Sequence, residues 1–123
     1  MVLIDTSVWI DHFRRGDELL TYLLEQSQVV LHPWVIGELA CGNLAQREQT
    51  IGLLQNLCVQ KIAQDNEVLF LIAQHGLFGL GIGYVDAQLL ASCRLFGYTL
   101  LTRDKRLLAA AQNLGLAYQA KLH

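Results

Sequence analysis

Four acidic residues of this 123-residue chain stand where a carboxylate could do chemistry. Asp5 and Asp104 each follow a short apolar segment typical of a buried strand, whereas Glu38 and Asp86 lie in mostly apolar segments of helical composition. Mg²⁺ and Mn²⁺ prefer oxygen ligands such as carboxylates. If the four acids converge, they could hold one or two such ions for the hydrolysis of a phosphodiester.

Each acid also has an ordinary structural interpretation. Asp5 could turn the chain after its strand, and Asp104 could cap the helix that follows it. Asp86 could interact favourably with the dipole of its own helix. Glu38 has the weakest structural alternative, because a carboxylate buried in an apolar helix needs a cation, a metal or several hydrogen bonds. The chemical interpretation therefore depends on the four side chains lying together.

Polar and basic neighbours of the acids could assist such a site. The hydroxyls of Thr6, Ser7 and Thr102 could orient ligands or hold waters, although at least one is expected to be an ordinary turn hydroxyl. Five basic residues could contact phosphates of RNA, and these are Arg14, Arg15, Arg103, Lys105 and Arg106. A solvated surface with ordinary salt bridges explains those five equally well.

The composition indicates one globular domain spanning residues 1–123. Hydrophobic residues make up 53% of the chain and charged residues 16%, which excludes a disordered chain. The formal net charge of −2 argues against a non-specific nucleic-acid binder. If the four acids form a metal cluster, however, seven acidic residues remain against nine basic ones, so RNA binding is permitted.

The start of the chain, its longest apolar region and its cysteines lead us to expect a cytoplasmic protein. The first five residues include no basic segment of the kind that opens a signal peptide. Polar residues and glycines interrupt the longest apolar region, 68–85, so no membrane span is expected. The three cysteines lack the paired spacing of a zinc site and are expected to be buried thiols.

Predicted strands alternate with helices along the chain. Strands are expected at 2–4, 29–31 and 99–101, with a weak one near 59–62 and an edge strand at 117–119. Helices are expected at 8–13, 19–24, 34–41, 46–57, 65–77, 84–96 and 105–114, and a glycine-rich loop at 76–83. Asp17 and Asp65 are expected to cap the second and fifth of these helices, Pro33 to open the third and Gly97 to end the sixth. This order predicts a three-layer α/β/α fold with a central parallel sheet.

Four segments resemble conserved blocks of the PIN domain, in particular of the VapC toxins of toxin–antitoxin pairs. They read LIDTSVWIDHF, VVLHPWVIGELACG, GIGYVDAQLLASCRL and LLTRDKRLL. The resemblance implies an α/β/α fold, a Mg²⁺ or Mn²⁺ site, endoribonuclease activity, frequent homodimers and inhibition by a cognate antitoxin. The family's acidic positions fall on Asp5, Glu38, Asp86 and Asp104, and its polar supporting positions fall on Thr6 or Ser7 and on Thr102.

Other functions remain open at this stage. A catalytically silent domain that only binds RNA or an antitoxin is disfavoured by the four intact acids. A receiver-like phosphoacceptor domain needs an aspartate after a central strand, and the segment 53–62 has none. A haloacid-dehalogenase-type phosphatase needs a second aspartate two residues after Asp5, where Ser7 stands.

Overall fold

A three-stranded parallel sheet forms the centre of the computed structural model, which describes residues 1–120. Its strands are β1 (Val2–Ile4), β2 (Val29–Val30) and β3 (Thr99–Leu101), in the order β2-β1-β3. Leu3 pairs with Val30 on one side and with Leu100 on the other. The three strands run in the same direction, so their carboxyl ends meet at one edge of the sheet.

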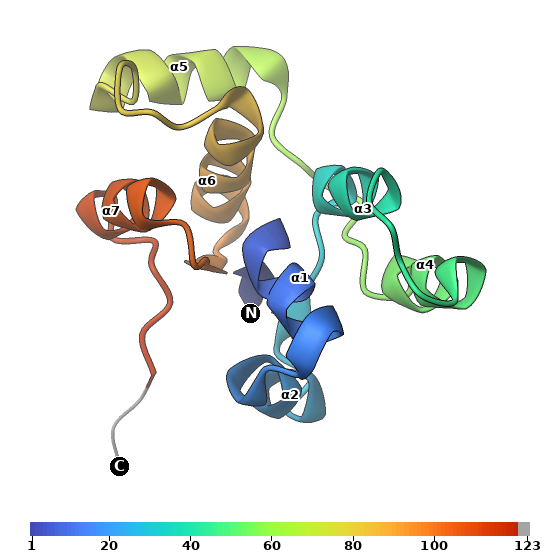
Figure 1. The fold of residues 1–123 in the computed structure, drawn as a ribbon. Helices are drawn as coiled ribbons and strands as arrows, with labels where there is room; N and C mark the ends of the chain where they lie inside the picture. The colour runs from blue at the N-terminus through green and yellow to red at the C-terminus, as the bar shows by residue number, and fades with distance from the viewer. Residues whose placement is uncertain (121–123) are drawn as a thin grey trace.

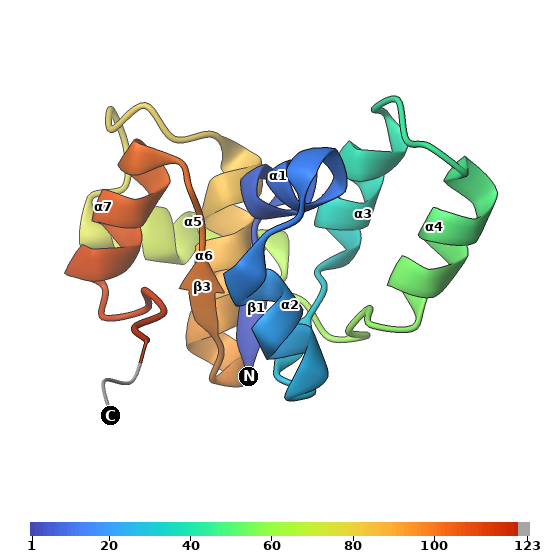
Figure 2. The ribbon, with the colours of Figure 1, turned by 60° about the horizontal axis from the view of Figure 1, so that its bottom comes forward.

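Helices cover both faces of this sheet (Figure 1). They are α1 (Thr6–Arg15), α2 (Glu18–Glu25), α3 (Pro33–Ala40), α4 (Arg47–Gln55), α5 (Asp65–His75), α6 (Tyr84–Phe96) and α7 (Lys105–Asn113). Figure 2 shows α1 and α2 in front of the strands and α6 behind β3, with which α6 is in contact. The predicted three-layer α/β/α fold is thereby confirmed.

The core lies between the sheet and its helices. Leu3, Ile4 and Leu100 of the strands are almost completely buried, as is expected of a parallel sheet that is covered on both faces. Leu20, Leu89 and Leu107 bring the helices onto the same core. In the described part of the chain, no helix is long and apolar enough to cross a membrane.

Local signals at the helix ends behave as predicted in most places. The side chain of Asp17 accepts a hydrogen bond from the Leu20 amide and so caps α2, Pro33 opens α3, and Gly97 ends α6 with a positive φ. The predicted cap at Asp65 is wrong, because Gln64 precedes the first turn of α5 and its amide donates to Glu67 Oε1 at 2.8 Å.

Two predicted strands are also wrong. Cys58, just before the 59–62 segment, makes a single isolated bridge with Leu31, and Ala117 of the 117–119 segment makes another with Leu100. A strand needs a continuing ladder of hydrogen bonds, whereas each segment meets the sheet at one point and then leaves it. The described sheet therefore stops at three strands.

Candidate active site

Asp5 sits where two neighbouring strands end, and its surroundings hold it firmly. Its amide donates to the Leu101 carbonyl at 2.9 Å, and only 6% of the residue is exposed. Oδ2 of Asp5 accepts two hydrogen bonds of 2.7 Å, one from Ser7 Oγ and one from Thr102 Oγ1. Because two hydroxyls donate to one oxygen, the orientation of this carboxylate is fixed.

Thr102 and Ser7 link Asp5 to the start of the last helix. Thr102 Oγ1 accepts a 3.1 Å hydrogen bond from the Asp104 amide, and Ser7 Oγ accepts a 3.0 Å hydrogen bond from the Arg103 amide. The loop after β3 is therefore attached to the residues after β1. Two of the three hydroxyls predicted to support the acids thus contact Asp5 directly.

Asp104 has the structural role that its position suggests. It is the N-cap of α7, and its Oδ1 accepts a 2.9 Å hydrogen bond from the Leu107 amide. The residue is exposed, and the cap uses only Oδ1, so Oδ2 has no protein donor within the described residues. Helix capping and a chemical role remain compatible for this side chain.

Glu38 lies on the outer face of α3. The expectation that it is buried is wrong, because Val35 and Leu39 turn into the core while Glu38 is exposed. Its Oε1 accepts a 2.6 Å hydrogen bond from Thr6 Oγ1 at the start of α1. The third predicted supporting hydroxyl therefore holds a second acid.

Asp86 is half-buried in the first turn of α6, and its Oδ2 accepts a 3.0 Å hydrogen bond from the Gly83 amide. Burial raises the pKa of Asp86, the hydrogen bond from Gly83 opposes this, and the charges of Asp5, Asp104 and Glu38 raise the pKa further. No basic side chain is among these causes. The four predicted acids, from four separate segments, therefore share one electrostatic neighbourhood.

One pattern is common to the four carboxylates. In each, one oxygen accepts hydrogen bonds from the protein, and these oxygens are Asp5 Oδ2, Glu38 Oε1, Asp86 Oδ2 and Asp104 Oδ1. Within residues 1–120, no protein donor reaches the second oxygen of any of them. Over the same residues, no three acidic, histidine or cysteine side chains are close enough to form a ready-made metal cluster.

The predicted phosphate-contacting residues differ in their surroundings. Arg103 is held by Asp17, whose Oδ2 lies 2.6 Å from Arg103 Nη2, and Arg15 lies 3.6 Å from Asp11. Arg106 packs over Gly81, where an added Cβ would lie 2.5 Å from Arg106 Nη1. The exposed Arg14 and Lys105 make no ion pair in the described part of the chain. The exposed Arg106 likewise makes no ion pair among these residues, so an acid engages only two of the five predicted basic side chains there.

A buried polar network, missed by the sequence analysis, connects two of the helices that carry the acids. His32 is fully buried before α3, and its Nδ1 accepts a 3.0 Å hydrogen bond from the Trp34 amide. The proton therefore resides on Nε2, which lies 3.3 Å from both Gln88 Oε1 and Ser92 Oγ on α6. Burial lowers the pKa of His32 to about 4, although the hydrogen bond with Gln88 opposes this shift.

Gln88 and Ser92 also hold the chain before α5. Gln88 Nε2 donates to the Ala63 carbonyl at 2.9 Å, and the Ala63 amide donates to Ser92 Oγ at 3.1 Å. Ser92 Oγ in turn donates to Gln88 Oε1 at 2.7 Å. The signal in the sequence was a glutamine and a serine, four residues apart, in an otherwise apolar helix.

Comparisons with known proteins agree with this architecture. The PIN domain family matches residues 2–113. Ribonuclease VapC32 from two strains of Mycobacterium tuberculosis is 47% identical to the chain over 118 residues, which is 95% of both proteins. These matches leave the receiver and phosphatase alternatives without support.

Two solved structures have a similar fold. FitAcB from Neisseria gonorrhoeae is 20% identical with a TM-score of 0.62, and the match covers 91% of this chain and 94% of that one. FitAB bound to an IR36 DNA fragment is 18% identical with a TM-score of 0.62 over the full length of both chains. At this level of identity, the likeness concerns the fold alone.

Proposed function

Because this chain belongs to the PIN domain family and is similar to VapC-type ribonucleases over nearly its whole length, we propose that it is a metal-dependent endoribonuclease, the toxin of a toxin–antitoxin pair. Its active site would consist of Asp5, Glu38, Asp86 and Asp104. We propose that it acts in the cytoplasm, where RNA and a cognate antitoxin would both be present.

The observation that best supports this proposal is that the two oxygens of each carboxylate have different surroundings. One oxygen is held by the protein and the other is free of protein donors in the described residues, as is typical of metal ligands whose orientation is fixed by outer partners. A purely structural set of acids would be expected to have basic partners. Asp86 instead has three further acids around it.

The donor set suits Mg²⁺ or Mn²⁺. These ions take oxygen ligands, and Mg²⁺ is usually bound by one or two carboxylates and several waters. Such coordination fits four acids that do not form a tight cluster of three within residues 1–120. A bound ion would supply positive charge at the scissile phosphodiester and make water more acidic.

The other residues would orient and bind. Ser7 and Thr102 would hold Asp5, and Thr6 would hold Glu38, so that the free oxygens keep their directions. The exposed Arg14 and Lys105 would contact RNA phosphates on either side of the acids. Arg103 would act mainly through its salt bridge with Asp17, which attaches the loop after β3 to α2.

We further propose an antitoxin that places a basic side chain among the acids. An arginine suits this position because its planar guanidinium can donate two parallel hydrogen bonds to a carboxylate. The free oxygens of the four acids are available acceptors. Such an arginine would occupy the place of the metal and of the substrate phosphate.

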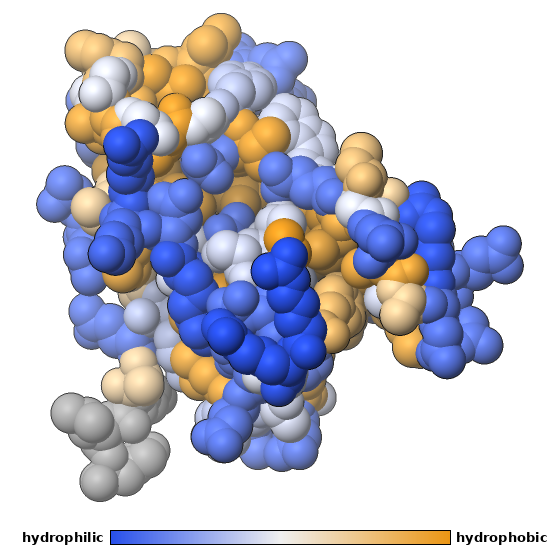
Figure 3. Space-filling view, viewed as in Figure 1, coloured by the Kyte–Doolittle hydropathy of each residue, from blue (hydrophilic) through white to orange (hydrophobic). Residues whose placement is uncertain are grey.

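A homodimer is the second proposed assembly, and the surface of α5 supports it. Large exposed apolar residues lie on α5 and on the loop after it, namely Leu69, Phe70, Phe78 and Leu80. Figure 3 shows hydrophobic residues gathered over this region, at the upper left. Patches of this kind usually mark an interface.

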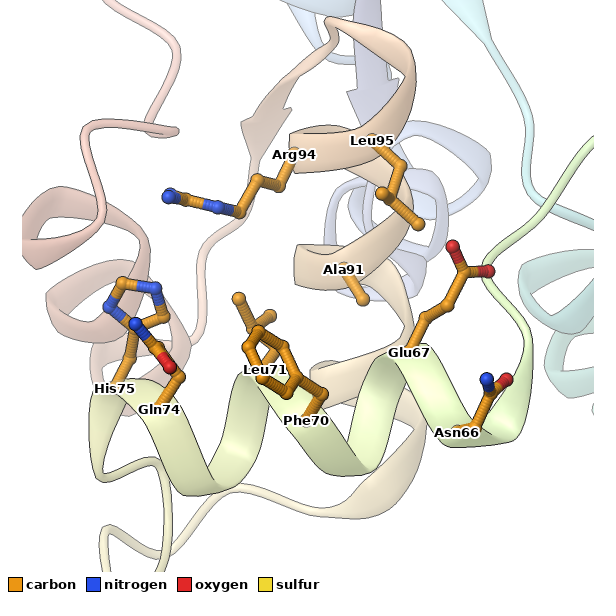
Figure 4. Close-up of a pocket in the computed structure, with 9 residues that line it drawn as sticks. All are labelled: Asn66, Glu67, Phe70, Leu71, Gln74, His75, Ala91, Arg94 and Leu95. Carbon is orange, nitrogen blue, oxygen red and sulfur yellow. The ribbon is translucent and has the colours of Figure 1, made fainter.

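A groove beside this patch is self-complementary in charge. It has a volume of about 440 Å³ between α5 and α6, and Figure 4 shows Glu67 and Arg94 at its opposite ends with Phe70 between them. A two-fold interface places one surface against itself. Glu67 of one copy could therefore pair with Arg94 of the other.

RNA cleavage by purified protein tests the enzymatic proposal. Wild-type protein should cleave total RNA when Mg²⁺ or Mn²⁺ is present, and this cleavage should stop in excess EDTA. The Asp5→Asn variant should not cleave RNA, although its circular-dichroism spectrum should be unchanged. Asp11→Asn is a matched control, because Asp11 is an acid of α1 that pairs with Arg15 outside the site. Undiminished cleavage in EDTA by nuclease-free wild-type protein would contradict the proposal.

A further inference from the structure

A small groove opens directly beside Glu38. The residues that line it come from α1, α3 and the segment after α3. Figures 1 and 2 show α1 next to α3, and the two helices are in contact. The volume of the groove is about 230 Å³. Phe13 and Arg14 of α1, Glu38 and Leu39 of α3, and Asn43 after α3 are among the residues that line it. Because Glu38 belongs both to the groove and to the acidic site, a ligand in one would border the other.

Phe13 gives the groove an aromatic wall that is already held in place. Its ring stacks on Trp9 at a centroid distance of 5.8 Å and an interplanar angle of 28°. Trp9 is only 2% exposed, whereas Phe13 is 41% exposed. One side of the Phe13 ring is thus supported by the core while much of the residue faces solvent. Exposed aromatic rings of this kind stack unpaired bases in proteins that bind single-stranded nucleic acid.

The polar residues of the groove match the remaining parts of a nucleotide. Asn43 is exposed, and its amide offers both donors and an acceptor to the edge of a base. Arg14 is exposed on the same helix as Phe13, and among residues 1–120 it makes no ion pair. A guanidinium is a favourable partner for a phosphate. An aliphatic protein segment in the groove would leave both of these polar groups unused.

We propose that this groove binds one unpaired base of the RNA, at a nucleotide next to the scissile phosphate. Phe13 stacks the base, Asn43 contacts its edge, and Arg14 binds the adjoining phosphate. The inference rests on the ribonuclease function proposed above and adds a substrate subsite to it. The groove then selects the base beside the cut, and single-stranded or looped RNA is the substrate class, because a base in a duplex cannot be stacked in this way.

Substitutions at Phe13 separate stacking from simple apolar contact. Binding of fluorescein-labelled single-stranded RNA oligonucleotides of each base would be measured by fluorescence anisotropy, with Asp5→Asn protein in EDTA so that the RNA stays intact. Phe13→Leu keeps an apolar side chain but removes the ring, and it should weaken binding about 5- to 100-fold. Phe13→Tyr keeps the ring and should bind like the parent. Tyr22→Leu is the control, because Tyr22 is an exposed aromatic residue on α2, outside both the groove and the proposed dimer patch.

Three results would overturn the inference. The parent could bind none of the oligonucleotides, Phe13→Leu could bind them as tightly as the parent does, or Tyr22→Leu could be weakened as strongly as Phe13→Leu. If RNA binding is unaffected while Phe13→Leu loses a co-purifying protein, the groove belongs to a protein partner and the inference fails.

Product sequencing adds a second test that keeps the two proposals distinguishable. In otherwise wild-type protein, Asn43→Ala should relax the base preference at one position beside the cut and leave cleavage metal-dependent. An unchanged cleavage pattern would count against the subsite. Phe13-dependent binding without any cleavage by wild type would contradict the ribonuclease function and leave the base subsite standing.

Discussion

The hydroxyl of Thr102 donates a 2.7 Å hydrogen bond to Oδ2 of Asp5, across 97 residues of sequence. The bond joins the carboxyl ends of β1 and β3, which are neighbours in the sheet. The same hydroxyl accepts a hydrogen bond from the Asp104 amide. One side chain therefore orients the carboxylate of Asp5 and holds the backbone of Asp104, another acid of the proposed site.

The first prediction concerns this buried hydroxyl. Thr102→Val keeps the shape of the side chain but removes the donor to Asp5 and the acceptor for the Asp104 amide. The free energy of unfolding should fall by about 1–3 kcal/mol, and RNA cleavage should fall roughly 10- to 100-fold. Urea unfolding and a cleavage assay measure the two effects. Thr102→Ser keeps the hydroxyl and should retain most of the stability and most of the RNA cleavage. A serine variant as impaired as Thr102→Val would argue against the role of the hydroxyl.

The second prediction concerns the repulsion around Asp86. The pKa of Asp86 is raised by burial and by three neighbouring acids. In the absence of metal, ionisation of Asp86 should therefore destabilise the folded protein once the pH rises above the usual pKa of an aspartate. Asp86→Asn keeps an acceptor for the Gly83 amide and removes the charge. In EDTA at neutral pH it should therefore be at least as stable as wild type.

Added Mg²⁺ gives the comparison that decides the role of Asp86. A ligand that binds only the folded protein stabilises it. Wild type should gain more stability from millimolar Mg²⁺ than Asp86→Asn does, as measured by urea unfolding. If Asp86 only interacts favourably with the helix dipole, the free energy of unfolding of the variant in EDTA should instead be lower by up to about 1 kcal/mol. Its response to Mg²⁺ should then equal that of wild type.

The third prediction concerns acid pH and His32. The pKa of His32 is lowered from 6.5 to about 4 by burial, so the neutral ring stabilises the folded state fully above about pH 6.5. This contribution should be lost as the pH falls toward 4, and it amounts to roughly 3 kcal/mol. Protonation would also remove the acceptor for the Trp34 amide.

A non-titrating variant isolates this effect from the titration of carboxylates. His32→Asn retains a side chain that can cap α3, and it should be less stable than wild type at pH 7. Its free energy of unfolding should, however, change less between pH 6.5 and pH 4. Identical pH profiles for the two proteins would contradict the assignment of a buried neutral His32.

The fourth prediction concerns the apolar surface of α5. Phe70 is 66% exposed beside the groove between α5 and α6, and Phe70→Asp would place a charge in the proposed dimer interface. The variant should sediment as a monomer in analytical ultracentrifugation at concentrations where wild type is a dimer. Tyr22→Asp is the control, because Tyr22 is also exposed but lies on α2. A monomeric wild type would contradict the proposed interface.

The fifth prediction concerns the antitoxin. In a protein that co-purifies with this chain and blocks its cleavage of RNA, one arginine should be essential for inhibition. Substitution of that arginine by alanine should restore cleavage while the complex still forms, because the other contacts of the antitoxin would remain. A lysine in its place should inhibit less, since it lacks the planar fork of donors. Inhibition that survives every such substitution would contradict this mode of blocking.

The sequence by itself determined the features that depend on short-range signals. The apolar runs at Val2–Ile4 and Thr99–Leu101 predicted buried strands, and Asp17, Pro33 and Gly97 marked helix ends, because capping and backbone preferences act within a few residues. Since strands of a parallel sheet end at one edge, the sequence could also predict that Asp5 and Thr102 lie near one another.

Only the tertiary structure decided which side chains are covered and which distant groups pair. The sequence of α3 could not reveal that Glu38 faces solvent, because a short apolar helix does not show which of its faces a neighbour covers. The bond between His32 and Gln88 spans 56 residues, and Arg103 reaches Asp17 across 86. Such pairs form only after packing has brought their helices together. The free oxygens of the four carboxylates depend on the same step, because the fold supplies a donor to one side of each acid and leaves the other side open.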